Sequence, residues 1–182
     1  MRVAITGAQG MLGQDLTRIF ASHHEVLALS RSELDVTVES RVRERLRELE
    51  PDWILHAAAF TRVDEAEARH EKAFATNVHG AQNVALAATE CGASILYYST
   101  DYVFSGLATA PYREDAPTDP VNYYGFSKRQ GERVVQSLCP TSLIIRTSWL
   151  FGAGGNDFVS AIVEAAKNKG RLEVVADQRG KP

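Results

Sequence analysis

The sequence has little with which to build a metal centre or a disulfide framework. Its two cysteines, Cys91 and Cys139, do not form the C-x-x-C pair of redox and zinc motifs. Three of its histidines, His56, His70 and His79, also lack the spacing of metal ligands. We therefore predict no metal ligand among the side chains, and the few cysteines favour a reducing cytoplasm.

Long apolar runs and an excess of one charge are also missing. Charged residues interrupt every segment before it reaches the roughly 20 apolar residues of a membrane span. The opening residues, MRVAITGAQG, lack the charged and long apolar regions of a signal peptide. The 20 basic and 23 acidic side chains leave a formal net charge of −3 at pH 7. We expect a soluble protein with neither nucleic acid nor membrane as a partner.

What the sequence does contain is enough apolar material for one core, since 45% of its residues are hydrophobic. Short apolar runs alternate with segments of helical period, which is typical of parallel strands joined by helical crossovers. We predict strands over residues 2–6, 25–29, 53–57, 94–99, 142–147 and 172–176. We predict helices over residues 11–22, 38–50, 70–91, 123–138 and 156–168. The fold class is α/β, a doubly wound parallel sheet of the Rossmann type.

Two segments rich in Gly, Pro and Asp, residues 101–121 and 148–156, directly follow predicted strands. Open α/β sheets bind ligands at the carboxyl ends of their strands, so both segments are expected near a ligand. The last predicted strand runs into DQRGKP, and no further element follows in the sequence. We expect a first domain over residues 1–170 and the start of a truncated substrate-binding region over residues 171–182.

The first predicted strand leads into TGAQGMLG, which places Gly7, Gly10 and Gly13 in front of an apolar helix. Glycines at this spacing allow a tight turn, close approach of the backbone to a pyrophosphate and close helix–strand packing. The helix N-terminus then offers free N–H groups to phosphates. Strand, loop and helix in this order indicate a dinucleotide site; the alternative is a purely structural turn.

The second predicted strand ends at SRSELDV, where the adenosine ribose of such a cofactor would lie. An acidic side chain there would bind the ribose hydroxyls, whereas an arginine could pair with a 2′-phosphate. Arg31 comes first, and Glu33 and Asp35 follow it. The order favours NADPH and leaves NADH possible; the alternative is a solvated turn in which Arg31 has no role.

The stretch NYYGFSK contains a candidate acid–base pair. On a helix Tyr124 and Lys128 are four residues apart and share a face, whereas Tyr123 and Lys128 diverge. A lysine beside a tyrosine favours the phenolate and eases proton transfer. Thr100, at the end of a predicted strand, could hydrogen-bond the same carbonyl. The alternative for Thr100 is a turn whose side chains hold the backbone.

These motifs, together with AAAFTRVDEAE, STDYVFSG and RTSWLFG, occur in the order seen in the extended short-chain dehydrogenases/reductases, which the whole chain resembles. The resemblance implies a catalytic triad of Thr100, Tyr124 and Lys128. Together with Arg31, the cofactor-binding residues it implies are Gly7, Gln9, Gly10, Met11, Leu12, Gly13, Asp35, Val36, Ala57, Ala58, Ala59 and Thr61. It also implies that Trp149 contacts a sugar. Alternatively, HAAAF is only a buried strand end and Trp149 a packed ring.

The activity implied by the resemblance is NADPH-dependent reduction of the C4 keto group of dTDP-4-dehydro-L-rhamnose, with residues 1–170 as the NAD(P)-binding domain. Tyr124 would donate the proton, Lys128 would hold the nicotinamide ribose and lower the pKa of the tyrosine, and Thr100 would bind the carbonyl oxygen. Magnesium and a homodimer are possible by resemblance only.

Two other functions stay open from the sequence. One is a regulatory subunit that keeps the fold and the cofactor cleft, as the similar methionine adenosyltransferase β subunit does. The other is an epimerase or dehydratase that works with bound NAD. Intact residues at all three triad positions favour an enzyme, and tightly held NAD without consumption of NADPH would identify the epimerase or dehydratase.

Overall fold

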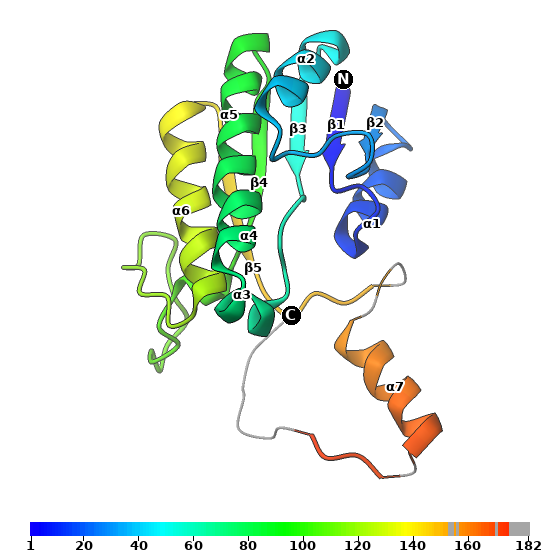
Figure 1. Ribbon diagram of the computed structural model, residues 1–182, viewed down its shortest axis with the longest axis vertical. Helices are drawn as coiled ribbons and strands as arrows, with labels where there is room; N and C mark the ends of the chain where they lie inside the picture. The colour runs from blue at the N-terminus through cyan, green and yellow to red at the C-terminus, as the bar shows by residue number, and fades with distance from the viewer. Residues whose placement is uncertain (153–154, 156, 170, 175–182) are drawn as a thin grey trace.

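The computed structural model describes residues 1–152, 155, 157–169 and 171–174, and its centre is a five-stranded parallel sheet (Figure 1). The strand order is β2-β1-β3-β4-β5, and every neighbouring pair is parallel. The strands are β1 (Arg2–Thr6), β2 (Glu25–Leu29), β3 (Trp53–His56), β4 (Ser94–Thr100) and β5 (Leu143–Thr147). The predicted doubly wound parallel sheet is confirmed. Of the sixth predicted strand, residues 172–174 lie in no strand, and residues 175 and 176 lie outside the described residues.

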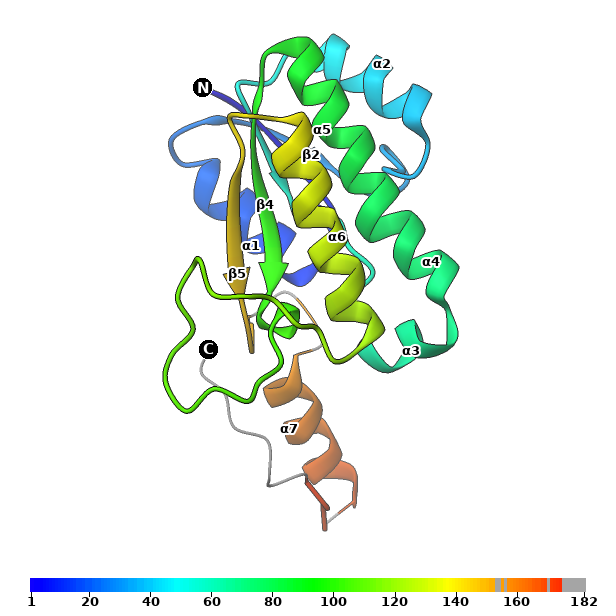
Figure 2. The same cartoon turned by 90° about the vertical axis from the view of Figure 1, so that its left-hand side faces the viewer.

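Helices cover both faces of the sheet, as Figures 1 and 2 show. Helix α1 (Met11–Phe20) packs on one face through a cluster that includes Ile5 and Leu16. Helices α2 (Glu39–Leu49), α5 (Gly80–Cys91) and α6 (Tyr123–Leu138) pack on the other. This two-sided burial explains why strands such as β3 are apolar at successive positions. Helix α7 (Phe158–Lys169) lies beyond the carboxyl ends of the strands in both views.

The segment predicted as one helix over residues 70–91 is three pieces. Helix α4 (His70–Phe74) continues into the π-helix η1 (Ala75–His79) and then into α5. Two short elements were not predicted, namely helix α3 (Val63–Ala68) and the 3₁₀ helix η2 (Asp101–Val103). Helix α5 covers the face of the sheet, whereas α3 and η2 lie at its carboxyl end, where a ligand would bind (Figure 2).

Membrane-spanning character is absent from the helices that the structure describes: none combines the length and the apolar character needed to cross a bilayer.

Candidate functional site

A cavity of about 600 Å³ opens at the carboxyl end of the sheet. Its walls come from the loops after β1, β2, β3, β4 and β5, together with the start of α6. It lies where the chain order of the sheet reverses, between β1 and β3, which is the expected ligand position in an open α/β sheet. All the predicted site residues line it: Gly7, Gln9, Gly10, Met11, Leu12, Gly13, Arg31, Asp35, Val36, Ala57, Ala58, Ala59, Thr61, Thr100, Tyr124, Lys128 and Trp149.

The glycine loop is built with almost no clearance. Gly7 has a φ of +71°, and a Cβ there would lie 2.7 Å from the backbone N of Ala58. A Cβ at Gly13 would collide with the carbonyl oxygen of Gly7 and lie 2.7 Å from the Cα of Ala8. Gly10 is the N-cap of α1 and has no side chain with which to cap it. The first residues of α1 form part of the cavity wall. The N–H groups of a helix N-terminus have no partner within the helix, and such an end is suited to bind phosphate.

In the loop after β2, where we predicted the adenosine end of a cofactor, the two acidic candidates are occupied by neighbouring groups. The Glu33 carboxylate accepts hydrogen bonds from the backbone N–H of Ser30, at 2.8 Å, and from the Ser30 hydroxyl, at 2.5 Å. The Asp35 carboxylate accepts from the N–H and hydroxyl of Thr37, at 3.0 and 2.7 Å. Arg31 pairs with Asp35 at 3.3 Å, but its side chain is 74% exposed. An exposed pair of this kind is weak, so the guanidinium can turn to another anion.

The wall after β3 is held by Asn77, which the sequence argument missed. Asn77 is 1% exposed and lies in the π-helix η1. Its Oδ1 accepts from the N–H of Phe60 at 2.8 Å, and its Nδ2 donates to the carbonyl of Phe60 at 3.1 Å and to the hydroxyl of Ser127 at 2.9 Å. Asn77 thus ties the loop containing Thr61 to helix α6. The one available sequence signal is a polar side chain on the buried face of an alanine-rich helix.

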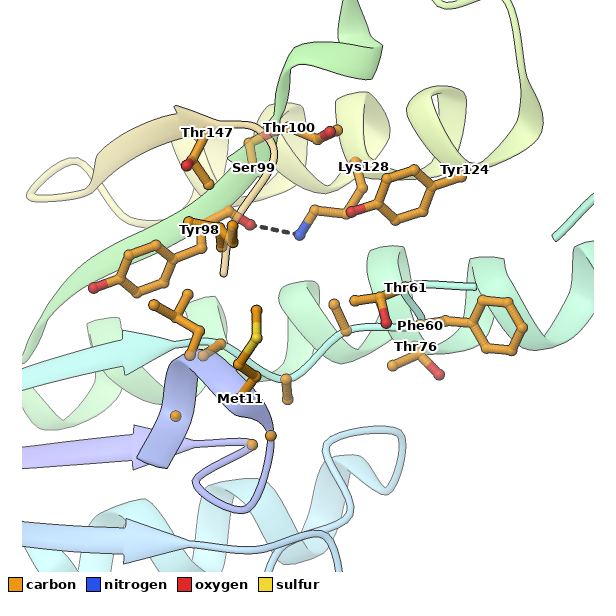
Figure 3. Close-up of a pocket in the computed structure, with 18 of the residues that line it drawn as sticks. Met11, Phe60, Thr61, Thr76, Tyr98, Ser99, Thr100, Tyr124, Lys128 and Thr147 are labelled. Atoms are coloured by element: carbon orange, nitrogen blue, oxygen red, sulfur yellow. Dashed lines mark hydrogen bonds between the residues drawn. The ribbon is translucent and has the colours of Figure 1, made fainter. Parts of the chain in front are cut away.

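Tyr124 reaches into the cavity from the first turn of α6, whereas Tyr123 stacks on His70 with ring centroids 3.7 Å apart. Figure 3 shows the Tyr124 hydroxyl directed towards the Lys128 side chain, across the cavity from Met11. Burial raises the pKa of Tyr124 to about 12, although the Thr100 hydroxyl partly offsets it. We expected Lys128 to lower this pKa; the pKa is raised instead, because the loss of water around the phenol outweighs the hydrogen bond with Thr100 and the charge of Asp101 adds to the rise.

Lys128 is buried, with 3% of its surface exposed. Its Nζ donates a 2.6 Å hydrogen bond to the carbonyl of Tyr98 (Figure 3). It also lies 4.1 Å from the centroid of the Tyr97 ring. Burial lowers the pKa of Lys128 to about 7, and the negative charge of Glu132 opposes this shift. The ammonium and the neutral amine are therefore close in free energy near neutral pH.

Thr100 ends β4 and is buried, with 5% of its surface exposed. Its Oγ1 donates to the Asp101 carboxylate and accepts from the N–H of Tyr102, both at 3.2 Å. The turn-holding role considered for this hydroxyl is therefore present, and the residue lines the cavity as well.

Trp149 lines the cavity with 47% of its surface exposed and a φ of +52°. A bulky residue in this left-handed region costs free energy and is common where side chains meet ligands. The exposed ring argues against simple packing. Among the described residues, no cluster of His, Cys, Asp and Glu could hold a metal ion.

Comparison with known proteins gives a consistent assignment. The chain is 45% identical over 183 residues to dTDP-4-dehydrorhamnose reductase of Aggregatibacter actinomycetemcomitans, covering 100% of the chain and 62% of that protein. It is 43% identical over 182 residues to the spore coat polysaccharide biosynthesis protein SpsK of Bacillus subtilis strain 168, covering 100% of the chain and 64% of that protein. The chain therefore spans about three fifths of the length of these curated relatives.

A crystal structure of dTDP-4-dehydrorhamnose reductase from Bacillus anthracis strain Ames in complex with NADP has a TM-score of 0.90 and 40% identity. That comparison covers 92% of this chain and 60% of the crystallised one. All of residues 1–182 match the family described as the RmlD substrate binding domain. The fold, the cleft at the strand ends and this match agree: the chain belongs to the RmlD substrate binding domain family.

Proposed function

We propose that the protein catalyses the NADPH-dependent reduction of the C4 keto group of dTDP-4-dehydro-L-rhamnose to dTDP-L-rhamnose, in nucleotide-sugar biosynthesis. The observation that carries this proposal is one cavity with a glycine loop on one wall and Tyr124, Lys128 and Thr100 on another. The name of the relative at 45% identity and the NADP complex of the relative at 40% identity support the same reaction class.

The residues present fit a dinucleotide. The N-terminus of α1, with Gly10, Met11 and Leu12 in the cavity wall, would hold the pyrophosphate through its free N–H groups. Gly7 and Gly13 allow the loop and the helix to pack this closely, because a Cβ at either position would meet backbone atoms. Asp35 and Val36 would contact the adenine side, and the small side chains of residues 57–59 would let the backbone approach a flat ring. Arg31 would pair with a 2′-phosphate, since Glu33 and Asp35 already hold neighbouring groups.

NADPH, when bound, supplies the hydride for the C4 carbonyl. Tyr124 donates its phenolic proton to the carbonyl oxygen, so that the alcohol forms and a phenolate remains to be reprotonated from solvent. A pKa near 12 keeps Tyr124 in the protonated form that a donor needs. Thr100 orients the carbonyl by a hydrogen bond, and Lys128, when charged, stabilises the phenolate. Trp149 would cover one face of the sugar.

The decisive experiment is NADPH oxidation by the full-length protein with dTDP-4-dehydro-L-rhamnose. We expect oxidation with this sugar, and faster turnover than with dTDP-4-keto-6-deoxy-D-glucose as the control. Oxidation with neither sugar would point to the regulatory alternative. Tightly held NAD in the purified protein, without consumption of added NADPH, would point to an epimerase or dehydratase.

Location, metal dependence and assembly belong to this proposal as well. Both cysteines are unpaired thiols, which suits a reducing compartment such as the cytoplasm. Magnesium dependence and a homodimer follow only from the family resemblance. Turnover with and without EDTA tests the first, and light scattering of the full-length protein tests the second.

A further inference from the structure

A fully buried carboxylate lies one helical turn beyond Lys128. Glu132 is 0% exposed and accepts a bidentate pair of hydrogen bonds from Arg146, each at 2.8 Å. Arg129 donates a third hydrogen bond, at 3.0 Å. Burial would raise the pKa of Glu132, but the hydrogen bonds and charges of the arginines hold it below its ordinary value. The carboxylate is therefore ionised and organises both guanidinium groups.

Each guanidinium group also reaches a long irregular segment, residues 104–121. Arg129 Nε donates to the hydroxyl of Thr118 at 2.8 Å, and Arg146 Nη1 donates to the carbonyl of Glu114 at 3.3 Å. The Arg146 guanidinium also lies 4.9 Å from the centroid of the Phe104 ring. Three separate points of the 104–121 segment are thus held by two side chains that share one carboxylate.

The 104–121 segment joins two parts of the cleft wall. It begins directly after η2, whose residues Asp101 and Tyr102 line the cavity, and it leads into α6, whose second residue is Tyr124. Figure 2 shows it as the light-green loop that leaves the end of β4 and returns to the start of α6. The rings of Tyr102 and Tyr124 meet edge to face, with centroids 5.9 Å apart. Movement of the 104–121 segment would therefore change the positions of both Tyr102 and Tyr124.

We propose that Glu132 is a positioning residue: through Arg129 and Arg146 it fixes the 104–121 segment, and thereby sets the substrate side of the cleft around Tyr102 and Tyr124. This inference deepens the proposed function and rests on it. Long segments without helix or strand inside a compact domain are usually either functional loops or linkers, and the side-chain bonds that hold this one favour a functional loop. A buried ion pair contributes little net stability compared with apolar packing. We therefore expect the main effect of this cluster to be the conformation of the 104–121 segment, and not the stability of the fold.

The test compares Glu132→Gln with wild type in the full-length protein. The amide keeps the shape but loses the charge that holds two arginines. We expect amide hydrogens of residues 104–121 to exchange about 10-fold faster, since hydrogen bonds to charged groups are the strong ones. We also expect the KM for the sugar nucleotide to rise about 10-fold, while the Kd for NADPH stays within about 2-fold. A role confined to stability would not separate KM from Kd in this way.

Two further variants keep the test decisive. Thr118→Val removes only the acceptor of Arg129 Nε, so it should fold even if Glu132→Gln does not, and it should speed exchange in the same segment to a smaller extent. Glu90→Gln is the matched control, because Glu90 on α5 also bridges two arginines, Arg43 and Arg47, but at the surface. It should change neither readout.

Unchanged exchange in residues 104–121 in both test variants, or an equal rise in sugar KM and NADPH Kd, would overturn the role of Glu132. Hydrogen exchange needs no turnover, so it tests this role even if the wild-type protein reduces neither sugar. In that case only the proposed function fails.

Discussion

At the scale of single residues, burial has changed the proton affinities of the pair on α6 in opposite directions. The pKa of Tyr124 is raised to about 12 and that of Lys128 is lowered to about 7. The sequence was sufficient to identify Tyr124 and Lys128 as a pair, because residues four apart on a helix share a face. It could not give the pKa shifts, because they depend on how much water the folded chain removes from each group.

Replacing Tyr124 with Phe should lower kcat by about 10²–10³-fold, because the proton donor is removed while the ring remains. NADPH affinity, measured by fluorescence titration, should stay within about 2-fold. Tyr123→Phe is the control, since that ring stacks on His70 and does not line the cavity. Equal losses in the two variants, or a loss only in Tyr123→Phe, would contradict the assignment of Tyr124 as the proton donor.

Replacing Lys128 with Met should stabilise the fold near pH 6, where the buried ammonium is costly, by about 1 kcal/mol or more, or roughly 2–4 °C in Tm. The lysine pKa is depressed in the fold, so the unfolded chain binds the extra proton between about pH 7 and 10.5. Wild-type stability therefore gains from Lys128 deprotonation as pH rises through that window. The advantage of the variant should shrink from pH 6 to pH 9. A melting-temperature difference that does not change with pH would contradict the buried-ammonium account.

At the scale of elements, the sequence was sufficient where burial follows a simple period. The five strands were predicted to within one residue at each end, because each is a short apolar run bounded by polar residues. The break of the 70–91 helix was not predicted. The hydrogen bonds of Asn77 with Phe60 and Ser127 join distant parts of the chain. The spacing of apolar residues does not predict such hydrogen bonds. Helix α3 is too short for its period to be recognised.

Gly13→Ala should test the packing of α1 against the loop after β1. The added Cβ meets backbone atoms of Gly7 and Ala8, so the helix N-terminus must shift. We expect a loss of about 1–3 kcal/mol in the free energy of unfolding and at least a 10-fold weaker affinity for NADPH, measured by calorimetry. Gly92→Ala is the control: its φ of +75° adds strain, but its Cβ would meet nothing within 4 Å. It should destabilise the fold without changing NADPH affinity, and a similar affinity loss there would show a general effect of destabilisation.

At the scale of the whole molecule, binding of the proposed cofactor should raise the stability of the fold. At a free NADPH concentration about 100 times its Kd, binding should add about 2.7 kcal/mol, or roughly 5–11 °C in Tm for a chain of this size. Arg31→Ala should weaken NADPH binding about 10-fold by removing the partner of the 2′-phosphate, and leave the smaller shift with NADH unchanged. Differential scanning fluorimetry measures both shifts. If Arg31→Ala lowered the thermal shift equally for NADPH and NADH, Arg31 would not recognise the 2′-phosphate.

The walls of the cavity are contributed by positions from Gly7 to Leu150. During synthesis at about 5–20 residues per second, the complete cavity is consequently not available for roughly 8–30 s. We therefore expect the proposed dinucleotide to bind after the strands that line the cavity have paired. Cofactor supply in the cell should therefore act mainly on the lifetime of the folded protein, by stabilising it once the cavity is complete.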